Sequence, residues 1–186
     1  MFRKTTLWLV VLLAAISFSM ACGGQEDEAN KLVNEANASI DKAKATDAKI
    51  GSLSKEILGE AWMNAEDNAK YVADNKAKFD ELAGLDEQNE KAMTEAAGKF
   101  DQASKLKVDD KFKEYLGVKS QQMKKLAEKY KSEASFVKSL LAEQDSDKAG
   151  KLSEDYAKKS AEMNKEIAEL TAKADKIMKD NPTVFK

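Results

Sequence analysis

Residues 112–141 read FKEYLGVKSQQMKKLAEKYKSEASFVKSLL, and this stretch decides the fold. Large apolar side chains recur in it at steps of three, four or seven residues, at positions Phe112, Leu116, Met123, Leu126, Tyr130, Val137 and Leu141. An α-helix completes a turn in about 3.6 residues, so these side chains share one face. Charged and small polar residues fill most positions between them. The stretch therefore predicts a long amphipathic helix that is buried along a single stripe.

The same spacing recurs on both sides of this stretch. Further apolar stripes run over residues 29–43, 58–83, 93–103 and 152–177. Residues that start or stop helices separate them, namely Gly51-Ser52, Gly84-Leu85-Asp86, Asp109-Asp110, Ser146-Asp147 and Asn181-Pro182. We predict an all-α fold, an elongated antiparallel helical bundle or coiled coil of five helices. If the breaks at Gly51 and Asp109 are only kinks, the bundle has three long helices instead.

The packing along these stripes is expected to be thin. Many stripe positions are alanine, which allows close approach of helices but buries little area. We therefore expect the larger side chains to carry much of the stability, namely Trp62, Phe79, Phe100, Phe112, Tyr130 and Phe136.

The first residues of the chain have the zoned composition of a secretory signal peptide. Arg3 and Lys4 give a positive start, residues 7–18 are almost continuously apolar, and Ser19-Met20-Ala21 leads into Cys22, which is the sole cysteine. A spanning helix needs about 20 apolar residues, and this run is shorter. A cleaved leader is therefore favoured over a retained membrane anchor.

Residues 19–22 resemble the lipobox of the bacterial lipoprotein family, in which small residues precede a lipidated cysteine. The resemblance implies that residues 1–21 are removed and that residues 22–186 form the mature helical domain, with a short tail from residue 182. It implies that Cys22 is lipidated. Ser19 stands where the family usually has leucine, so cleavage by ordinary signal peptidase, which would leave Cys22 as a free thiol, is the alternative.

A lipidated Cys22 implies a location at a membrane surface. A single acyl chain anchors a protein marginally, whereas two or more anchor it stably. We expect the protein to be held at the cell membrane by covalent lipid, facing the periplasm or the exterior. In a cell with two membranes Gly23 favours the outer one, because aspartate at that position retains some lipoproteins at the inner membrane.

Composition excludes several functional classes. The chain has no histidine, and Arg3 in the leader is its one arginine, so haem and zinc sites of the usual kind, Ser-His pairs and arginine clamps are not expected. Residues 22–186 carry a net charge of −4 with both signs interspersed, which offers no basic footprint for nucleic acid. We expect no catalytic residues, no cofactor and no metal, and we expect that the protein is not an enzyme.

Three features invite a binding interpretation, and each has a structural alternative. Asp145 to Ser153 resembles an EF-hand loop in part, but Tyr156 stands where the chelating glutamate belongs, so a capped interhelical turn is favoured. Glu162 and Glu166 lie one turn apart, but lysines surround them, which favours a solvated face. Trp62, at helical spacing, could belong to an aromatic ligand pocket, but aromatic residues at this spacing are usually part of the core, so the core interpretation is favoured.

The C-terminal Lys186 permits a second functional hypothesis. The murein lipoprotein family also combines a lipidated cysteine, a helical rod and a terminal lysine, which in that family is joined to peptidoglycan. This chain is similar to it in Cys22, helicity and Lys186 alone. Both expected helix counts are odd, which would place Cys22 and Lys186 at opposite ends of the rod and suit a tether.

We therefore carry three hypotheses from the sequence. The first is a non-enzymatic scaffold or interaction lipoprotein of the cell envelope, with a protein partner or self-association. The second is a structural tether between membrane and peptidoglycan through Lys186. The third is a periplasmic bundle that binds ligands or acts as a chaperone near Trp62.

Overall fold

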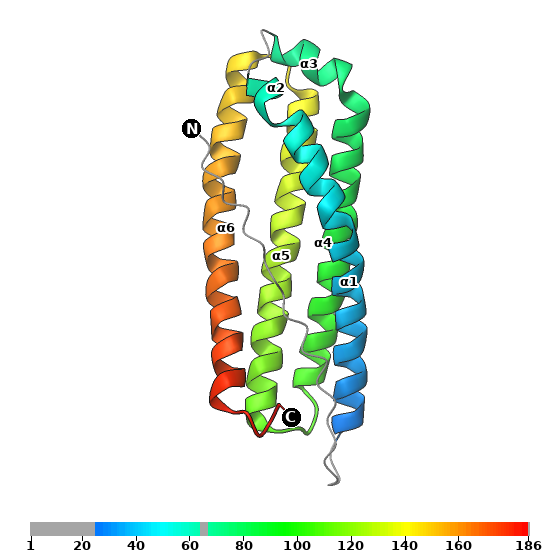
Figure 1. Ribbon diagram of the computed structural model, residues 1–186, viewed down its shortest axis with the longest axis vertical. Coiled ribbons are helices and arrows are strands. Elements are labelled where there is room, and N and C mark those ends of the chain that lie inside the picture. The colour runs from blue at the N-terminus through cyan, green and yellow to red at the C-terminus, as the bar shows by residue number, and fades with distance from the viewer. Residues whose placement is uncertain (1–24, 64–66, 186) are drawn as a thin grey trace.

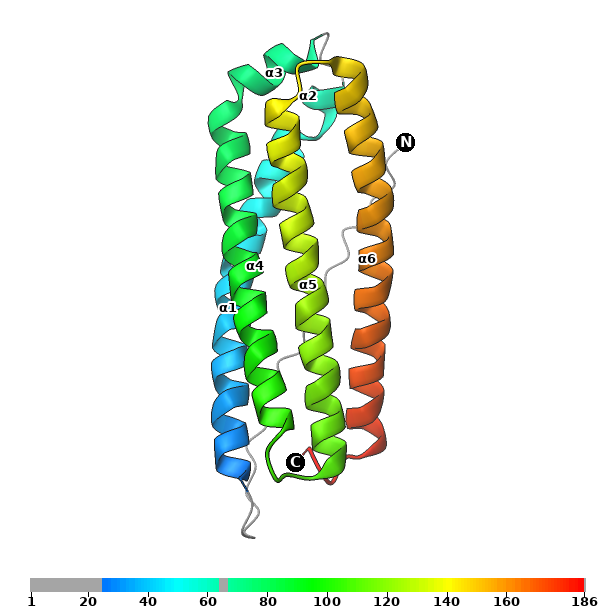
Figure 2. The same cartoon turned by 180° about the vertical axis from the view of Figure 1, so that it is seen from behind.

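The computed structural model describes residues 25–63 and 67–185, and all regular secondary structure in this part of the chain is α-helical. Four helices are long: α1 (Glu26–Ile57), α4 (Lys76–Ser104), α5 (Asp110–Ala142) and α6 (Ser146–Asp180). Two short helices, α2 (Glu60–Met63) and α3 (Asn68–Asp74), lead from α1 to α4. The long helices lie side by side and alternate in direction (Figures 1 and 2). The predicted all-α fold, an elongated antiparallel bundle, is confirmed.

The boundaries of the helices confirm some of the predicted breaks and contradict others. Helix α5 begins after Asp109 and α6 after Asp145, as expected, and each of these aspartates caps its helix through its side chain. The predicted breaks at Gly51 and Gly84 are wrong, because α1 and α4 continue through them. Glycine inside a helix costs only about 1 kcal/mol relative to alanine, which the burial of the surrounding apolar stripe outweighs.

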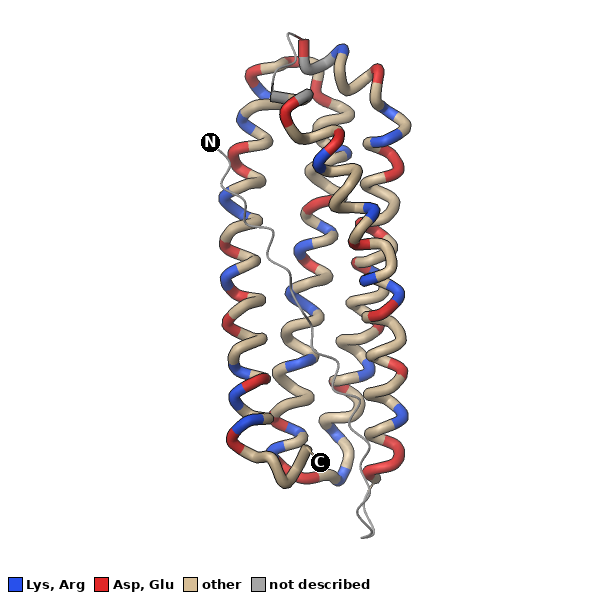
Figure 3. Tube along the Cα trace, in the orientation of Figure 1, with Lys and Arg blue, Asp and Glu red and all other residues tan. Residues whose placement is uncertain are grey.

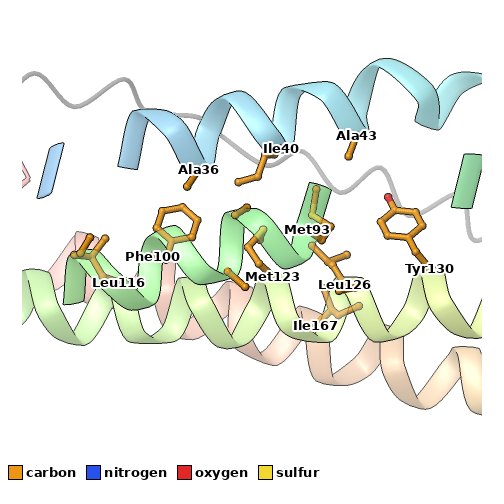
Figure 4. Close-up of a cluster of buried hydrophobic side chains, with 14 of the residues drawn as sticks. Ala36, Ile40, Ala43, Met93, Phe100, Leu116, Met123, Leu126, Tyr130 and Ile167 are labelled. Atoms are coloured by element: carbon orange, nitrogen blue, oxygen red, sulfur yellow. The ribbon is translucent and has the colours of Figure 1, made fainter. Parts of the chain in front are cut away.

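The long helices pack in chain order, α1 on α4, α4 on α5 and α5 on α6. Figure 4 shows the small side chains of Ala36 and Ala43 on α1 facing the larger Phe100 and Met93 on α4. Alanine on one helix lets a bulky side chain on the other fill the space between the two backbones. The alanine seam is therefore matched by aromatic and thioether side chains from the opposite helix.

Most of the large side chains that were expected to stabilise the bundle lie in its core. The buried ones are Trp62, Phe79, Phe100, Phe112 and Tyr130. Phe136 is half-buried instead and stacks on Tyr156 of α6, with ring centroids 4.3 Å apart. The core divides into a main cluster along α1, α4 and α5, a second one around Trp62, and a small third one between α5 and α6.

The start of α1 and the C-terminal tail lie at the same end of the bundle (Figure 1). The Gln25 amide donates to the carbonyl of Lys107 in the α4–α5 connection, at 3.3 Å. At this same end the ring of Phe185 packs edge-on against Phe112 and Tyr115, with centroids 6.0 and 5.1 Å apart. Gln25 and Phe185 therefore lie at the same end of the bundle, whereas the prediction of opposite ends was made for Cys22 and Lys186, which lie outside the described residues. An even number of long helices brings the chain back to its starting end.

Candidate functional site

Two of the predicted site residues, Cys22 and Lys186, lie outside the described residues. Their chain neighbours are described. Helix α1 begins at Glu26, only four residues after Cys22. Val184 and Phe185, directly before Lys186, pack against the main hydrophobic cluster. The described residues next to the two predicted attachment points therefore lie at the same end of the bundle.

The loop that partly resembles an EF-hand is a helix cap. One carboxylate oxygen of Asp145 accepts the amides of Asp147 and Lys148, at 3.0 and 3.1 Å. The carboxylate thus satisfies amide groups at the start of α6, which confirms the interpretation as a capped turn. Across residues 25–63 and 67–185, no three acidic or cysteine side chains cluster in a way that could hold a metal ion.

The glutamates of α6 lie on a solvated face, as expected. Glu166 pairs with Lys125 of α5, at 2.9 Å, and Glu162 is exposed. Figure 3 shows both signs of charge interspersed along the long helices. Such pairs are expected to contribute little to stability, since water screens them.

Trp62 is a packed core residue. Its ring contacts those of Tyr71 and Phe79 edge-on, with centroids 6.1 and 6.5 Å apart, and 8% of the residue is exposed. A groove of about 440 Å³ lies nearby, lined by Val72, Ala73, Lys76, Leu141, Glu143 and Gln144. Trp62 does not line this groove. Its surroundings therefore favour the core interpretation over an aromatic ligand pocket.

A layer of polar side chains, which reaches from the interior to the exposed Asp47, joins all four long helices. We call it the polar layer, and it consists of Asp47, Asp86, Asn89, Lys129, Tyr130, Glu133 and Tyr156. Tyr130 extends from α5 towards α1 (Figure 4). Its hydroxyl donates to Asp47 at 2.8 Å, and the Asn89 amide donates to the same carboxylate oxygen at 3.0 Å.

A second carboxylate of the polar layer is also held by donors. The Tyr156 hydroxyl of α6 donates to Glu133 of α5 at 2.8 Å. The ammonium group of Lys129 lies 3.3 Å from the same carboxylate oxygen, and both partners of this ion pair are largely buried. Burial next to these carboxylates raises the pKa of the Tyr130 and Tyr156 hydroxyls, which therefore stay protonated as donors.

Asp86 is the member of the polar layer that lacks a partner. It is 1% exposed, and its Oδ1 atom has no hydrogen-bond donor, the one buried side-chain oxygen or nitrogen in the described residues for which this holds. Burial raises its pKa to about 8, helped by Glu133 and opposed by Lys129, with Asp47 adding to the rise. A charged carboxylate in this position would face two others with a single ammonium group nearby.

A second buried titratable group lies nearer the other end of α5. Lys119 is 8% exposed, donates to the side-chain oxygen of Gln122 at 2.6 Å, and lies 6.0 Å from the centre of the Phe100 ring. Gln122 in turn donates to Thr171 of α6 at 2.6 Å. Burial lowers the pKa of Lys119 to about 8, against the opposing effect of Asp175. No carboxylate forms an ion pair with it within the described residues.

The sequence patterns did not identify Asp86, Asn89 and Lys119 as buried polar residues, although all three lie at the helical spacing of the apolar stripes. Lys119 fills the seven-residue gap between Leu116 and Met123 in the stripe of residues 112–141. Asp86 and Asn89 continue the α4 stripe at steps of four and three from Leu82, the same steps that then reach Met93. The stripes of α4 and α5 thus contain polar residues at buried positions, which a search for apolar residues alone does not find.

No family model matches the chain, and no curated protein or solved structure matches it significantly. None of the helices in the described part of the chain has the length and apolar character needed to cross a bilayer.

Proposed function

We propose that this chain is a lipid-anchored, non-enzymatic protein of the cell envelope that acts as a scaffold or interaction module. The observation that carries the proposal is the position of Cys22, the sole cysteine, between an apolar leader and the start of α1 at Glu26. Four residues of chain span at most about 14 Å. A lipid on Cys22 would therefore hold the bundle directly against the membrane surface.

The shape of the bundle supports a role in which one end is held at the membrane and the other is presented to a partner. The α1 start, the α4–α5 connection and the tail form the end that adjoins Cys22, whereas α2 and α3 lie at the opposite end (Figure 1). Helix α6 has 35 residues, which corresponds to a length of about 50 Å. A protein anchored through Cys22 would thus present α2 and α3 about 50 Å from its attachment point.

The argument from rod length for a tether to peptidoglycan fails. It required the two ends of the mature chain to lie at opposite ends of the rod, and the residues next to Cys22 and Lys186 lie at the same end. A ligand-binding role near Trp62 likewise gains no support from the packed surroundings of that side chain. The scaffold or interaction role is therefore the one we put forward.

Metabolic labelling in the native host tests the anchor. Cells are fed a fatty acid that carries an alkyne, and the protein is captured and compared between wild type and Cys22→Ser. We expect label and membrane association in the wild type and neither in the variant. A matched control, Ser19→Ala, changes a neighbouring small residue and is expected to keep both. An exported wild-type protein with an unmodified thiol would refute the proposal.

Photo-crosslinking on intact cells tests the interaction role. A crosslinking amino acid is placed at exposed Ala73 in α3, far from the anchor, or at exposed Ala168 on α6 as the control. We expect a discrete adduct, with another protein or with a second copy, from Ala73 in the lipidated protein, and loss of that adduct in Cys22→Ser. Identical adducts from both positions, unaffected by loss of the lipid, would count against specific interaction at the displayed end.

A further inference from the structure

The carboxyl group of Asp86 interacts electrostatically with groups from every other long helix. Glu133 and Lys129 of α5 and Asp47 of α1 act on its charge, and its charge acts in turn on Tyr156 of α6. These neighbours bring two negative charges and one positive charge. The nearest environment of Asp86 is therefore already negative before its own carboxyl group ionises.

The donors that could stabilise a charged Asp86 are used by the other carboxylates. Tyr130 and Asn89 donate to Asp47, Tyr156 donates to Glu133, and Lys129 pairs with Glu133. Asp86 Oδ1 is left without a donor at 1% exposure. A buried carboxylate without donor or counter-charge costs several kcal/mol, whereas a neutral carboxylic acid costs far less.

We propose that Asp86 is a proton-binding site of the folded bundle, whose carboxyl group holds a proton among the four long helices at neutral pH and releases it when the bundle unfolds. The absence of any three-ligand acidic cluster in the described residues leaves the proton, rather than a metal cation, as the fitting ligand. This inference does not depend on the lipid at Cys22. A protein facing the periplasm or the exterior would meet the pH of its surroundings directly.

The direction of the pH dependence follows from the two protonation states. The pKa of Asp86 is raised from 3.8 to about 8 in the folded protein. Between those values the folded chain binds one proton more than the unfolded chain does. The stabilisation by this proton is fully present below the pKa of Asp86 in the unfolded chain, and it is lost as the pH rises through about 8.

Chemical unfolding of wild type and Asp86→Asn, each purified as the full chain under identical conditions, tests the proposal. The amide mimics the protonated carboxyl group but cannot ionise. We expect the unfolding equilibrium constant of wild type, divided by that of Asp86→Asn, to rise about tenfold per pH unit between about pH 5 and 7. The ratio should level off above about pH 9. Asp80→Asn, an exposed change on the same helix, should show no such rise.

Infrared spectroscopy of the folded protein provides a second measurement that does not depend on the variant's stability. We expect a protonated-carboxyl band in wild type at neutral pH, its loss at alkaline pH, and its absence from Asp86→Asn. A ratio that is flat with pH, or a wild-type spectrum without that band at neutral pH, would overturn the proposal. If Asp86→Asn does not fold, the pH titration of the wild-type band alone decides.

Discussion

At the scale of single residues, the interior of the bundle holds an acid and an amine, Asp86 and Lys119, whose pKa values shift in opposite directions on burial. Burial disfavours the charged form of each, so it raises the pKa of the acid and lowers that of the amine. Lys119 retains a hydrogen bond to Gln122 and lies near the Phe100 ring, whereas Asp86 Oδ1 has no hydrogen-bond donor. The two groups therefore link stability to pH in different ranges.

Replacing Lys119 with methionine should change the pH dependence of stability in a defined direction. The pKa of Lys119 falls from 10.5 to about 8 on folding. Between those values the unfolded chain binds one proton more, so stability rises with pH. We expect wild type to gain up to about 3 kcal/mol over Lys119→Met across this range, as measured by urea unfolding.

Lys124→Met, on the exposed face of the same helix, is the matched control for this prediction. It removes the same charge from a solvated position, so its stability relative to wild type should stay nearly constant over the same pH range. If the difference in the free energy of unfolding between wild type and Lys119→Met were equally constant with pH, burial would not lower the pKa of Lys119.

At the scale of elements, local signals and tertiary packing decide different helix boundaries. The starts of α5 and α6 were predictable, because Asp109 and Asp145 bind amides two or three residues further along the chain. The end of α1 was not, because glycine at position 51 and glycine at position 59 look alike in sequence. A Cβ atom at Gly51 would meet nothing within 4 Å, whereas one at Gly59 would lie 2.2 Å from the carbonyl oxygen of Lys55.

Alanine substitutions should separate these two glycines. Gly51→Ala is expected to raise the free energy of unfolding by about 0.5–1 kcal/mol, because it lowers the entropy of the unfolded chain without a clash. Gly59→Ala is expected to destabilise by more than about 1 kcal/mol, because backbone must move away from the new methyl group. Thermal unfolding followed by circular dichroism measures both changes. A destabilising Gly51→Ala would contradict a continuous α1.

At the scale of the whole molecule, an even or odd number of long antiparallel helices decides whether the first and last helices have their free ends at the same end of the bundle. The stripes predicted an elongated bundle correctly, but they did not show that residues 60–63 and 68–74 would form short helices at the far end. After the short helices the chain runs back along α4. Helices α5 and α6 then bring the tail to the end of the bundle where α1 starts (Figure 2). The consequence is functional, since it removes the geometric case for a tether.

Distances between spin labels should confirm this arrangement. Labels are placed on Asp27→Cys with Lys179→Cys, at the start of α1 and the end of α6, in a chain that carries Cys22→Ser. The comparison pair is Asp27→Cys with Lys148→Cys, at the start of α6, and all three positions are exposed. Since the two label positions on α6 lie about 45 Å apart along the helix, we expect a much shorter distance for the first pair than for the comparison pair. A longer distance for the first pair would refute the four-helix topology.

Local sequence patterns accounted for the helical character of the chain, its buried stripes and the caps at Asp109 and Asp145, because these features depend on residues within a few turns of one another. The position of Cys22 after an apolar stretch is also a local feature, and it is the basis of the proposed anchor. Only the tertiary structure decided which polar residues lie together. Asp47 and Tyr130 are 83 residues apart, yet they share a hydrogen bond beside Asp86. Whether a buried carboxyl group finds a donor depends on such distant neighbours, which no local pattern encodes.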